Sequence, residues 1–135
     1  MKSINDFKVG DIARSTREII ESDLVEFARL SGDSNPIHLD DVYAAKTVFK
    51  RRIAHGLFLG SFISALIASE MPGEGAIYLK QSLSFKSPAF LNDVIVTEIE
   101  ILELNEEKNS LLLKTTCKTN EDRVVIVGEA LVKLQ

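Results

Sequence analysis

The sequence predicts an α+β fold: a single domain in which an antiparallel sheet of about five strands wraps around one long central helix. Two observations lead to this prediction. Residues 56–69, GLFLGSFISALIAS, carry no charge, and the run is longer than a usual strand. From Ala76 onward the apolar residues recur at every second position, as they do in strands that bury one face. Because helices precede the strands and do not alternate with them, the class is α+β.

The length of 135 residues suits one domain, and neither a repeat nor a linker divides residues 1–135. The net charge of −4 argues against a nucleic-acid partner, which would require a basic face. We expect no signal peptide and no membrane span, because the N-terminus lacks an apolar stretch and the run 57–68 is too short. The single cysteine, Cys117, excludes an internal disulfide and a cysteine-based zinc site. A cytoplasmic location is therefore expected.

The first third of the chain predicts a strand near residues 11–19 and then a helix. Ser22 is a candidate N-cap, Asp23 favours the first turn, and Gly32 is placed to end the helix. The apolar stripe of this helix comprises Leu24, Phe27, Ala28 and Leu30. Residues 39–49, LDDVYAAKTVF, predict a second, shorter helix.

The charge-free segment 56–69 is predicted to be a central helix. A helix that is apolar on every side should be buried all round. A stripe of small residues repeats at every fourth position, which would let another backbone approach closely; it consists of Gly56, Gly60, Ser64 and Ala68. A continuous buried strand is the alternative, but the length and the small-residue spacing favour the helix.

The remaining strands are predicted within residues 76–85, 93–104, 110–119 and 123–134. The alternation slips near Ile101 and Leu102, which predicts a β-bulge there. Cys117 shares a strand face with Leu111, Leu113 and Thr115, so we expect a buried, inert thiol and not a nucleophile. In the last strand the predicted common face comprises Val124, Ile126, Gly128, Ala130, Val132 and Leu134.

The turn SGDSNPIHLD, residues 31–40, holds the first candidate site. On a purely structural interpretation, Asp33 and Asn35 bond nearby backbone, and Pro36 keeps Asn35 out of the helical region. On a functional interpretation, a rigid turn presents Asp33 and His38 to one cleft. Histidine exchanges a proton near neutral pH, and a neighbouring carboxylate can orient a water molecule or the ring.

The segment AHGLFLG, residues 54–60, holds the second candidate site. A helix N-terminus offers free N–H groups and a partial positive charge, which can stabilise a developing oxyanion. Gly56 carries no side chain to screen its N–H.

Together, GDSNPIHLD (32–40) and RIAHGLFLGSFISALI (52–67) resemble the MaoC-like hydratases, which are (R)-specific enoyl-CoA hydratases of the hot-dog fold. The resemblance covers essentially the whole chain. It implies an antiparallel sheet around one helix, a homodimer, and hydration of trans-2-enoyl-CoA or the reverse dehydration. It also implies that no metal or redox cofactor is needed, and CoA is part of the substrate.

The resemblance also implies roles for individual residues. Asp33 and His38 match the catalytic pair, and Asn35 matches an amide position beside the water or the thioester. Gly56 matches the residue whose N–H receives the thioester carbonyl, and Ser61 matches a serine that lines the pocket. We interpret His55 as structural, holding the turn before the helix.

Three alternatives stay open at this point. A 3-hydroxyacyl-[acyl-carrier-protein] dehydratase would use the same residues on a carrier-protein thioester. The Asp33–His38 pair argues against a hot-dog thioesterase and against a non-catalytic acyl-CoA-binding module. Acyl chain length and pathway are not determined by these residues. Candidates for holding the CoA phosphates are the basic residues Arg51, Arg52, Lys80 and Lys86.

Overall fold

The computed structural model describes residues 1–135 and confirms the α+β prediction. One antiparallel sheet has the strand order β1-β4-β5-β6-β2, and β3 also pairs with β6. The strands are β1 (Ile12–Glu18), β2 (Ile77–Gln81), β3 (Ser84–Phe85), β4 (Val94–Asn105), β5 (Ser110–Thr119) and β6 (Val124–Lys133). The helices are η1 (Ile4–Asp6), α1 (Glu21–Ser31), α2 (Pro36–Leu39), α3 (Asp41–Ala45) and α4 (Gly56–Ser69).

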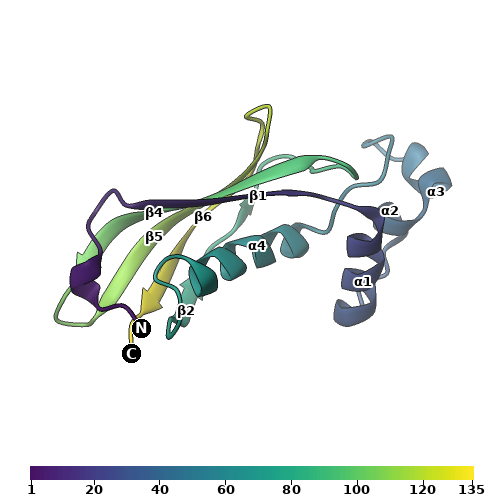
Figure 1. Ribbon diagram of the computed structural model, residues 1–135. Coiled ribbons are helices and arrows are strands. Elements are labelled where there is room, and N and C mark those ends of the chain that lie inside the picture. Colours follow the sequence, from purple (N-terminus) through teal and green to yellow (C-terminus); the bar gives the residue numbers. More distant parts are fainter.

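Figure 1 shows α4 lying along the concave face of the curved sheet. The short helices α1–α3 gather beyond one end of α4, and the two chain termini lie together at the opposite end. This arrangement brings the segment that follows α1 next to the start of α4. The candidate site is located there.

The central helix α4 spans the predicted residues 56–69, but it is not buried all round. One side packs into the core through Phe58, Leu59, Phe62, Ile63, Leu66 and Ile67. The other side is open, with Leu57 64% exposed and Ser61, Ser64 and Ala68 also exposed. The prediction of complete burial is therefore wrong for a single chain, because the sheet covers only one side of the helix.

The strand predictions are largely confirmed. β5 has the predicted bounds, and the β4–β5 register shifts between Ile101 and Glu103, where the bulge was expected. The sheet has six strands, in agreement with the expected number of about five, and residues 76–85 form two of them, β2 and β3. The predicted face of β6 fails at its start: Val124 is 40% exposed and Val125 is buried. A register shift after Cys117 pairs Lys118 with Val124 and leaves Val125 as the extra residue.

The first helices differ in detail from their predictions. The N-cap of α1 is Ile20 and not Ser22, because the Asp23 carboxylate accepts the Ile20 N–H at 3.1 Å and starts the helix earlier. Gly32 ends α1 in the left-handed conformation, as predicted, with φ 81°. Leu30 is 69% exposed and lies off the buried stripe. The predicted helix 39–49 is replaced by α2 and α3, which meet at Asp40, the N-cap of α3.

Cys117 lies in the core between the sheet and α4. Burial raises the pKa of the Cys117 thiol to about 11, and the hydrogen bond with Thr97 opposes this only in part. The protonated thiol is a poor nucleophile at neutral pH, as expected for an inert core cysteine. No helix combines the length and the apolar character needed to cross a membrane.

Candidate active site

The site forms where the segment after α1 meets the first residues of α4. Asp33 lies in the turn between α1 and α2, His38 lies on α2, and His55 is the N-cap of α4. One donor atom from each of these three side chains lies within 4.8 Å of the others. The structure therefore brings the predicted pair together and adds His55 to it.

A chain of side-chain-to-backbone bonds shapes the turn that carries Asp33. The Ser31 hydroxyl donates to the Phe27 carbonyl at 2.7 Å and accepts the Asp33 N–H at 3.1 Å. Asp33 Oδ1 accepts the Asn35 N–H at 3.2 Å, and Asn35 Oδ1 caps α2 by accepting the Ile37 N–H at 3.2 Å. These bonds define the turn and leave the second carboxylate oxygen of Asp33 without a hydrogen bond inside the chain.

His38 is held in one tautomer by a backbone carbonyl. Its Nδ1 lies 2.8 Å from the Ile53 carbonyl oxygen. A carbonyl can only accept, so Nδ1 carries the proton of the neutral ring and Nε2 is the acceptor. Burial lowers the pKa of His38; the Ile53 bond opposes this, the neighbouring His55 lowers the pKa further, and Asp33 raises it. A mostly buried ring with a free Nε2 lone pair can act as a base.

His55 joins the pair through a second carbonyl bond. Its Nε2 lies 3.0 Å from the main-chain oxygen of Asp33, and its ring stacks on His38 with centroids 3.8 Å apart. Phe27 packs against another side of the ring at 4.8 Å. Nδ1 of His55 is buried and has no hydrogen-bond partner.

One carboxylate and two imidazoles are also the donors of a metal site, so that use has to be weighed. Each ring already commits one nitrogen to a backbone carbonyl. The rings are stacked at 26° with centroids 3.8 Å apart, so the lone pairs of the other two nitrogens lie in two nearly parallel planes, an arrangement that does not favour two ligands converging on one tetrahedral ion. The geometry suits proton transfer better than metal binding.

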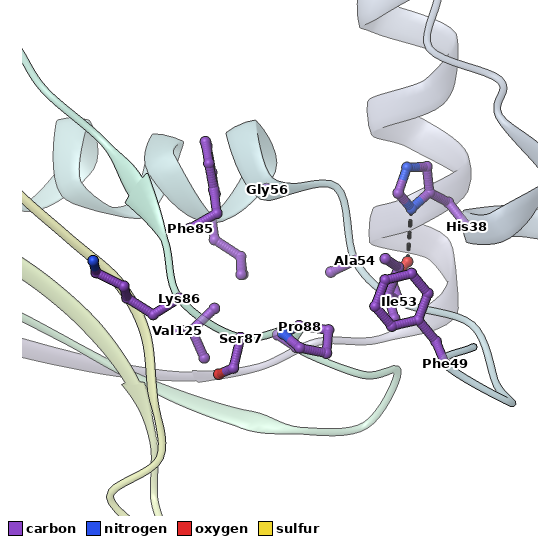
Figure 2. Close-up of a pocket in the computed structure, with 12 residues that line it drawn as sticks. His38, Phe49, Ile53, Ala54, Gly56, Phe85, Lys86, Ser87, Pro88 and Val125 are labelled. Atoms are coloured by element: carbon purple, nitrogen blue, oxygen red, sulfur yellow. Dashed lines mark hydrogen bonds between the residues drawn. The ribbon is translucent and has the colours of Figure 1, made fainter. Parts of the chain in front are cut away.

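Two clefts meet at this site. The apolar cleft, about 380 Å³, is lined mainly by apolar residues such as Phe49, Ile53, Leu59 and Val125. The second cleft, about 450 Å³, is lined by Asp33 and His55 together with Ser31, Phe27 and Leu57. Three residues line both clefts: His38, Gly56 and Phe85. In Figure 2 the Phe85 ring lies beside the first turn of α4, and His38 with its bond to Ile53 lies beyond the end of that helix.

Gly56 is the first residue of α4, so no carbonyl within the helix accepts its N–H. The predicted oxyanion position is thus a helix N-terminus at the junction of the two clefts. A β-carbon at Gly56 would lie 2.5 Å from Cε1 of Phe85. Any larger residue at this position would therefore have to displace the Phe85 ring, which is 56% exposed.

Two other predicted residues lie less directly in the site. Asn35 lines neither cleft, and its side-chain oxygen caps α2. Ser61 is exposed on the open side of α4, lines neither cleft, and donates its hydroxyl to the Phe58 carbonyl. Their roles in substrate binding stay predictions.

The structure distinguishes among the four basic residues that were predicted to hold the CoA phosphates. Arg52 is only 5% exposed and is ion-paired with Glu21 at 3.0 Å and Asp41 at 2.9 Å, so it is a poor candidate for holding a phosphate. Lys86 lines the apolar cleft, whereas Lys80 lines a separate hollow on the sheet. The Arg51 guanidinium lies 3.8 Å from the centre of the Phe90 ring. Arg51 also lines a separate hollow, beside Phe90 and Arg123, so Lys86 is the candidate that lies at the site.

Sequence reasoning missed three parts of the site. The Ile53 carbonyl contributes only main-chain atoms, which leave no residue signature. Phe85 lies in a two-residue strand and is 56% exposed, so nothing in the sequence pattern separates it from a surface aromatic. The closeness of His55 to Asp33 depends on how α4 docks against the turn, although its position before Gly56 was a signal.

Comparisons with known proteins identify the family and the fold of the chain. Residues 8–123 match the model of the MaoC like domain family. The chain is 42% identical to an (R)-specific enoyl-CoA hydratase of Aeromonas caviae over 132 residues, 98% of each chain. It is 43% identical to a 3-hydroxybutyryl-CoA dehydratase of Methylorubrum extorquens over 129 residues, 96% of this chain and 82% of the relative.

Among solved structures, an (R)-hydratase from A. caviae involved in PHA biosynthesis superposes with a TM-score of 0.93. It shares 43% of its sequence with this chain, and the match covers 96% of this chain and 98% of that one. The predicted hot-dog arrangement is confirmed by this similarity and by the sheet around α4.

The protonation of His38 gives a prediction on pH. As a base the ring must be neutral, so kcat/KM for water addition to an enoyl thioester should fall as the pH drops through the His38 pKa. Because that pKa is lowered, the acidic limb should lie below pH 6.5. Asp33→Asn removes a charge that raises the pKa, so it should move the limb of any residual activity to still lower pH. Rates measured across pH on both proteins test this, and a wild-type limb above 6.5 would contradict it.

Proposed function

The chain belongs to the family of MaoC-like domains, and from this membership we propose that it is an (R)-specific enoyl-CoA hydratase. It adds water to trans-2-enoyl-CoA to give (R)-3-hydroxyacyl-CoA and catalyses the reverse dehydration. The observation that carries the proposal is the Asp33–His38 pair beside the Gly56 end of α4, at the junction of two clefts. We take residues 1–135 to be one hydratase domain.

Asp33 and His38 activate the water molecule. Conjugation with the thioester carbonyl makes C3 of the substrate electrophilic. The free carboxylate oxygen of Asp33 and Nε2 of His38 can both accept from one water molecule, which orients it and makes it more basic. That water adds to C3 as His38 takes its proton. Asp33 is exposed, so solvent water can reach its carboxylate.

The Gly56 N–H stabilises the charge that develops on the thioester oxygen. Addition at C3 pushes electrons through C2 to that oxygen, giving an enolate. An N–H at a helix N-terminus is a preorganised donor, and it carries the positive end of the α4 dipole. The protonated His38 then gives its proton to C2. Because one ring serves both carbons, hydroxyl and proton add to the same face of the double bond.

The acyl group of the substrate could be carried as a thioester of CoA or of an acyl-carrier protein. The relatives include a hydratase and a dehydratase named for CoA substrates, and on this basis we propose CoA in place of a carrier protein. We propose Lys86 as a contact for the CoA phosphates, because it lines the apolar cleft. We also propose that Asn35 and Ser61 contact the substrate. Because neither residue lines a cleft of the single chain, we place these contacts in the assembled enzyme.

We propose a homodimer as the active species, because the single chain leaves two apolar surfaces open. The first is the edge strand β2, where Ile77, Tyr78 and Leu79 are 40%, 39% and 50% exposed. The opposite edge, β1, carries Arg14, Arg17 and Glu18, which protect an edge from pairing. The second surface is the open side of α4, where small residues allow a close approach.

The dimer is tested by measuring mass and activity on the same sample. Light scattering of the purified chain should give twice the monomer mass of 15.0 kDa. Dilution until the dimer dissociates should abolish activity if the partner completes the site. A monomer mass with full activity would contradict the proposal.

The reaction is tested by following the absorbance of crotonyl-CoA and of longer enoyl-CoAs with purified protein. We expect loss of the conjugated thioester without release of free CoA. The product should be oxidised by a dehydrogenase specific for the (R)-3-hydroxyacyl enantiomer and not by one specific for (S). Free CoA would indicate a thioesterase, and activity confined to carrier-protein thioesters would favour the alternative dehydratase.

Substitution of the pair tests the mechanism. Asp33→Ala and His38→Ala should each lower kcat by about 10²-fold or more, the range of positioned acid–base groups. Because both groups act on one water, the double variant should be little slower than the slower single variant. Ser61→Ala, which changes a residue outside both clefts of the chain, should have a milder effect.

Circular dichroism controls for folding in this series. If a folded His38→Ala protein keeps more than about a tenth of the wild-type rate, its loss of rate is smaller than the expected range, and the assignment is overturned.

A further inference from the structure

We propose that His55 is a positioning residue, which sets the place of Asp33 relative to His38 during the reaction. This deepens the proposed function, which it takes as its premise, and it replaces the interpretation of His55 as a structural residue of the turn. His55 does not reach the substrate in this proposal. It acts through the two residues that do.

The first observation is that the ring contacts both members of the pair. Its Nε2–H donates to the Asp33 carbonyl at 3.0 Å, and its face lies against the His38 ring at 3.8 Å. The hydrogen bond links the ring to the turn that carries the acid, and the stacking places it against the ring of the base. His55 is therefore the side chain through which the position of the Asp33 turn can be set relative to His38.

The second observation is that the two segments are joined reciprocally. His55, before α4, donates to the carbonyl of Asp33 in the turn, and His38, on α2, donates to the carbonyl of Ile53 in the segment before α4. Each segment thus supplies one imidazole donor and one carbonyl acceptor. Two such bonds fix both translation and rotation of one segment against the other, which a single bond cannot do.

The third observation concerns the nitrogen that has no partner. Nδ1 of His55 is buried without a hydrogen bond, and the residue is only 2% exposed. A buried polar atom without a partner is costly and requires an explanation. With Nε2 donating to Asp33, the neutral ring places no hydrogen on Nδ1. A second proton would create a buried N–H with no acceptor, on a ring whose centroid lies 3.8 Å from that of His38. The arrangement thus directs the transferred proton to His38.

Two variants separate the two contacts. His55→Gln keeps a side-chain N–H that can reach the Asp33 carbonyl but removes the stacked ring. His55→Phe keeps a flat ring against His38 but leaves the Asp33 carbonyl without its donor. The matched control is Phe62→Leu, another buried aromatic of α4 that lines neither cleft.

Kinetics on crotonyl-CoA give the first readout. A shift of about 1 Å in a catalytic group can cost on the order of 10²-fold in rate. We expect His55→Phe to lower kcat by about 10²-fold with KM little changed. We expect His55→Gln to retain at least about a tenth of the wild-type kcat. Phe62→Leu should lower thermal stability without this loss of kcat. If His55→Gln and His55→Phe lose kcat equally, or if kcat follows stability across all three variants, the proposal is overturned.

The second readout does not depend on catalysis. The chain has two histidines, so each His55 variant keeps one, and its imidazole titration by NMR is that of His38. The charged groups near that ring are Asp33 and, along the apolar cleft, Lys86. Asp33 raises the pKa of His38, so Asp33→Asn should lower the titration midpoint.

The size of that decrease reports how close Asp33 stays to His38. It should be the same in the wild type and in His55→Gln, and less than half as large in His55→Phe. An equal decrease in all three backgrounds would show that His55 does not position Asp33. Should the wild-type protein fail to hydrate enoyl-CoA, the proposed function fails, and the NMR comparison still decides the role of His55.

Discussion

Two imidazole-to-carbonyl hydrogen bonds that run in opposite directions join the turn after α1 to the start of α4, and the site depends on this join. They link His38 to Ile53 and His55 to Asp33. Both rings are at least nine-tenths buried, so water competes weakly for these bonds. Each bond also selects a tautomer. The pattern of donors and acceptors at the site therefore follows from the docking of two short segments.

The docking is rigid because α4 is rigid. Six apolar side chains anchor one side of the helix to the sheet, and the core residue Cys117 bonds the Leu59 carbonyl through its sulfur. A helix fixed in this way holds its first N–H in one place, and precise placement is what an oxyanion donor requires. The turn that carries Asp33 has less burial, but its successive side-chain bonds give it a defined shape.

Much of the fold could be predicted because its signals are local. The charge-free run gave the bounds of α4, and the alternation gave β5 and the bulge after Ile101. The open side of α4 could not be predicted, since glycine, serine and alanine lack charge and look the same whether a sheet or a second chain covers them. The Ser22 cap was wrong because the Asp23 carboxylate accepts the Ile20 N–H and starts the helix two residues earlier.

The same distinction between local sequence signals and long-range packing applies to the site. Asp33 and His38 could be paired from sequence because five positions separate them around a proline. His55 is far from Asp33 along the chain, so its contact with that residue could be learned only from the packing of α4. Gly56 was found by its place at the start of an apolar helix, but one packing feature of the position was hidden: a β-carbon there would lie 2.5 Å from the Phe85 ring. A side chain at this position would therefore have to displace a ring that lines both clefts, in addition to screening the N–H that we propose for the thioester oxygen.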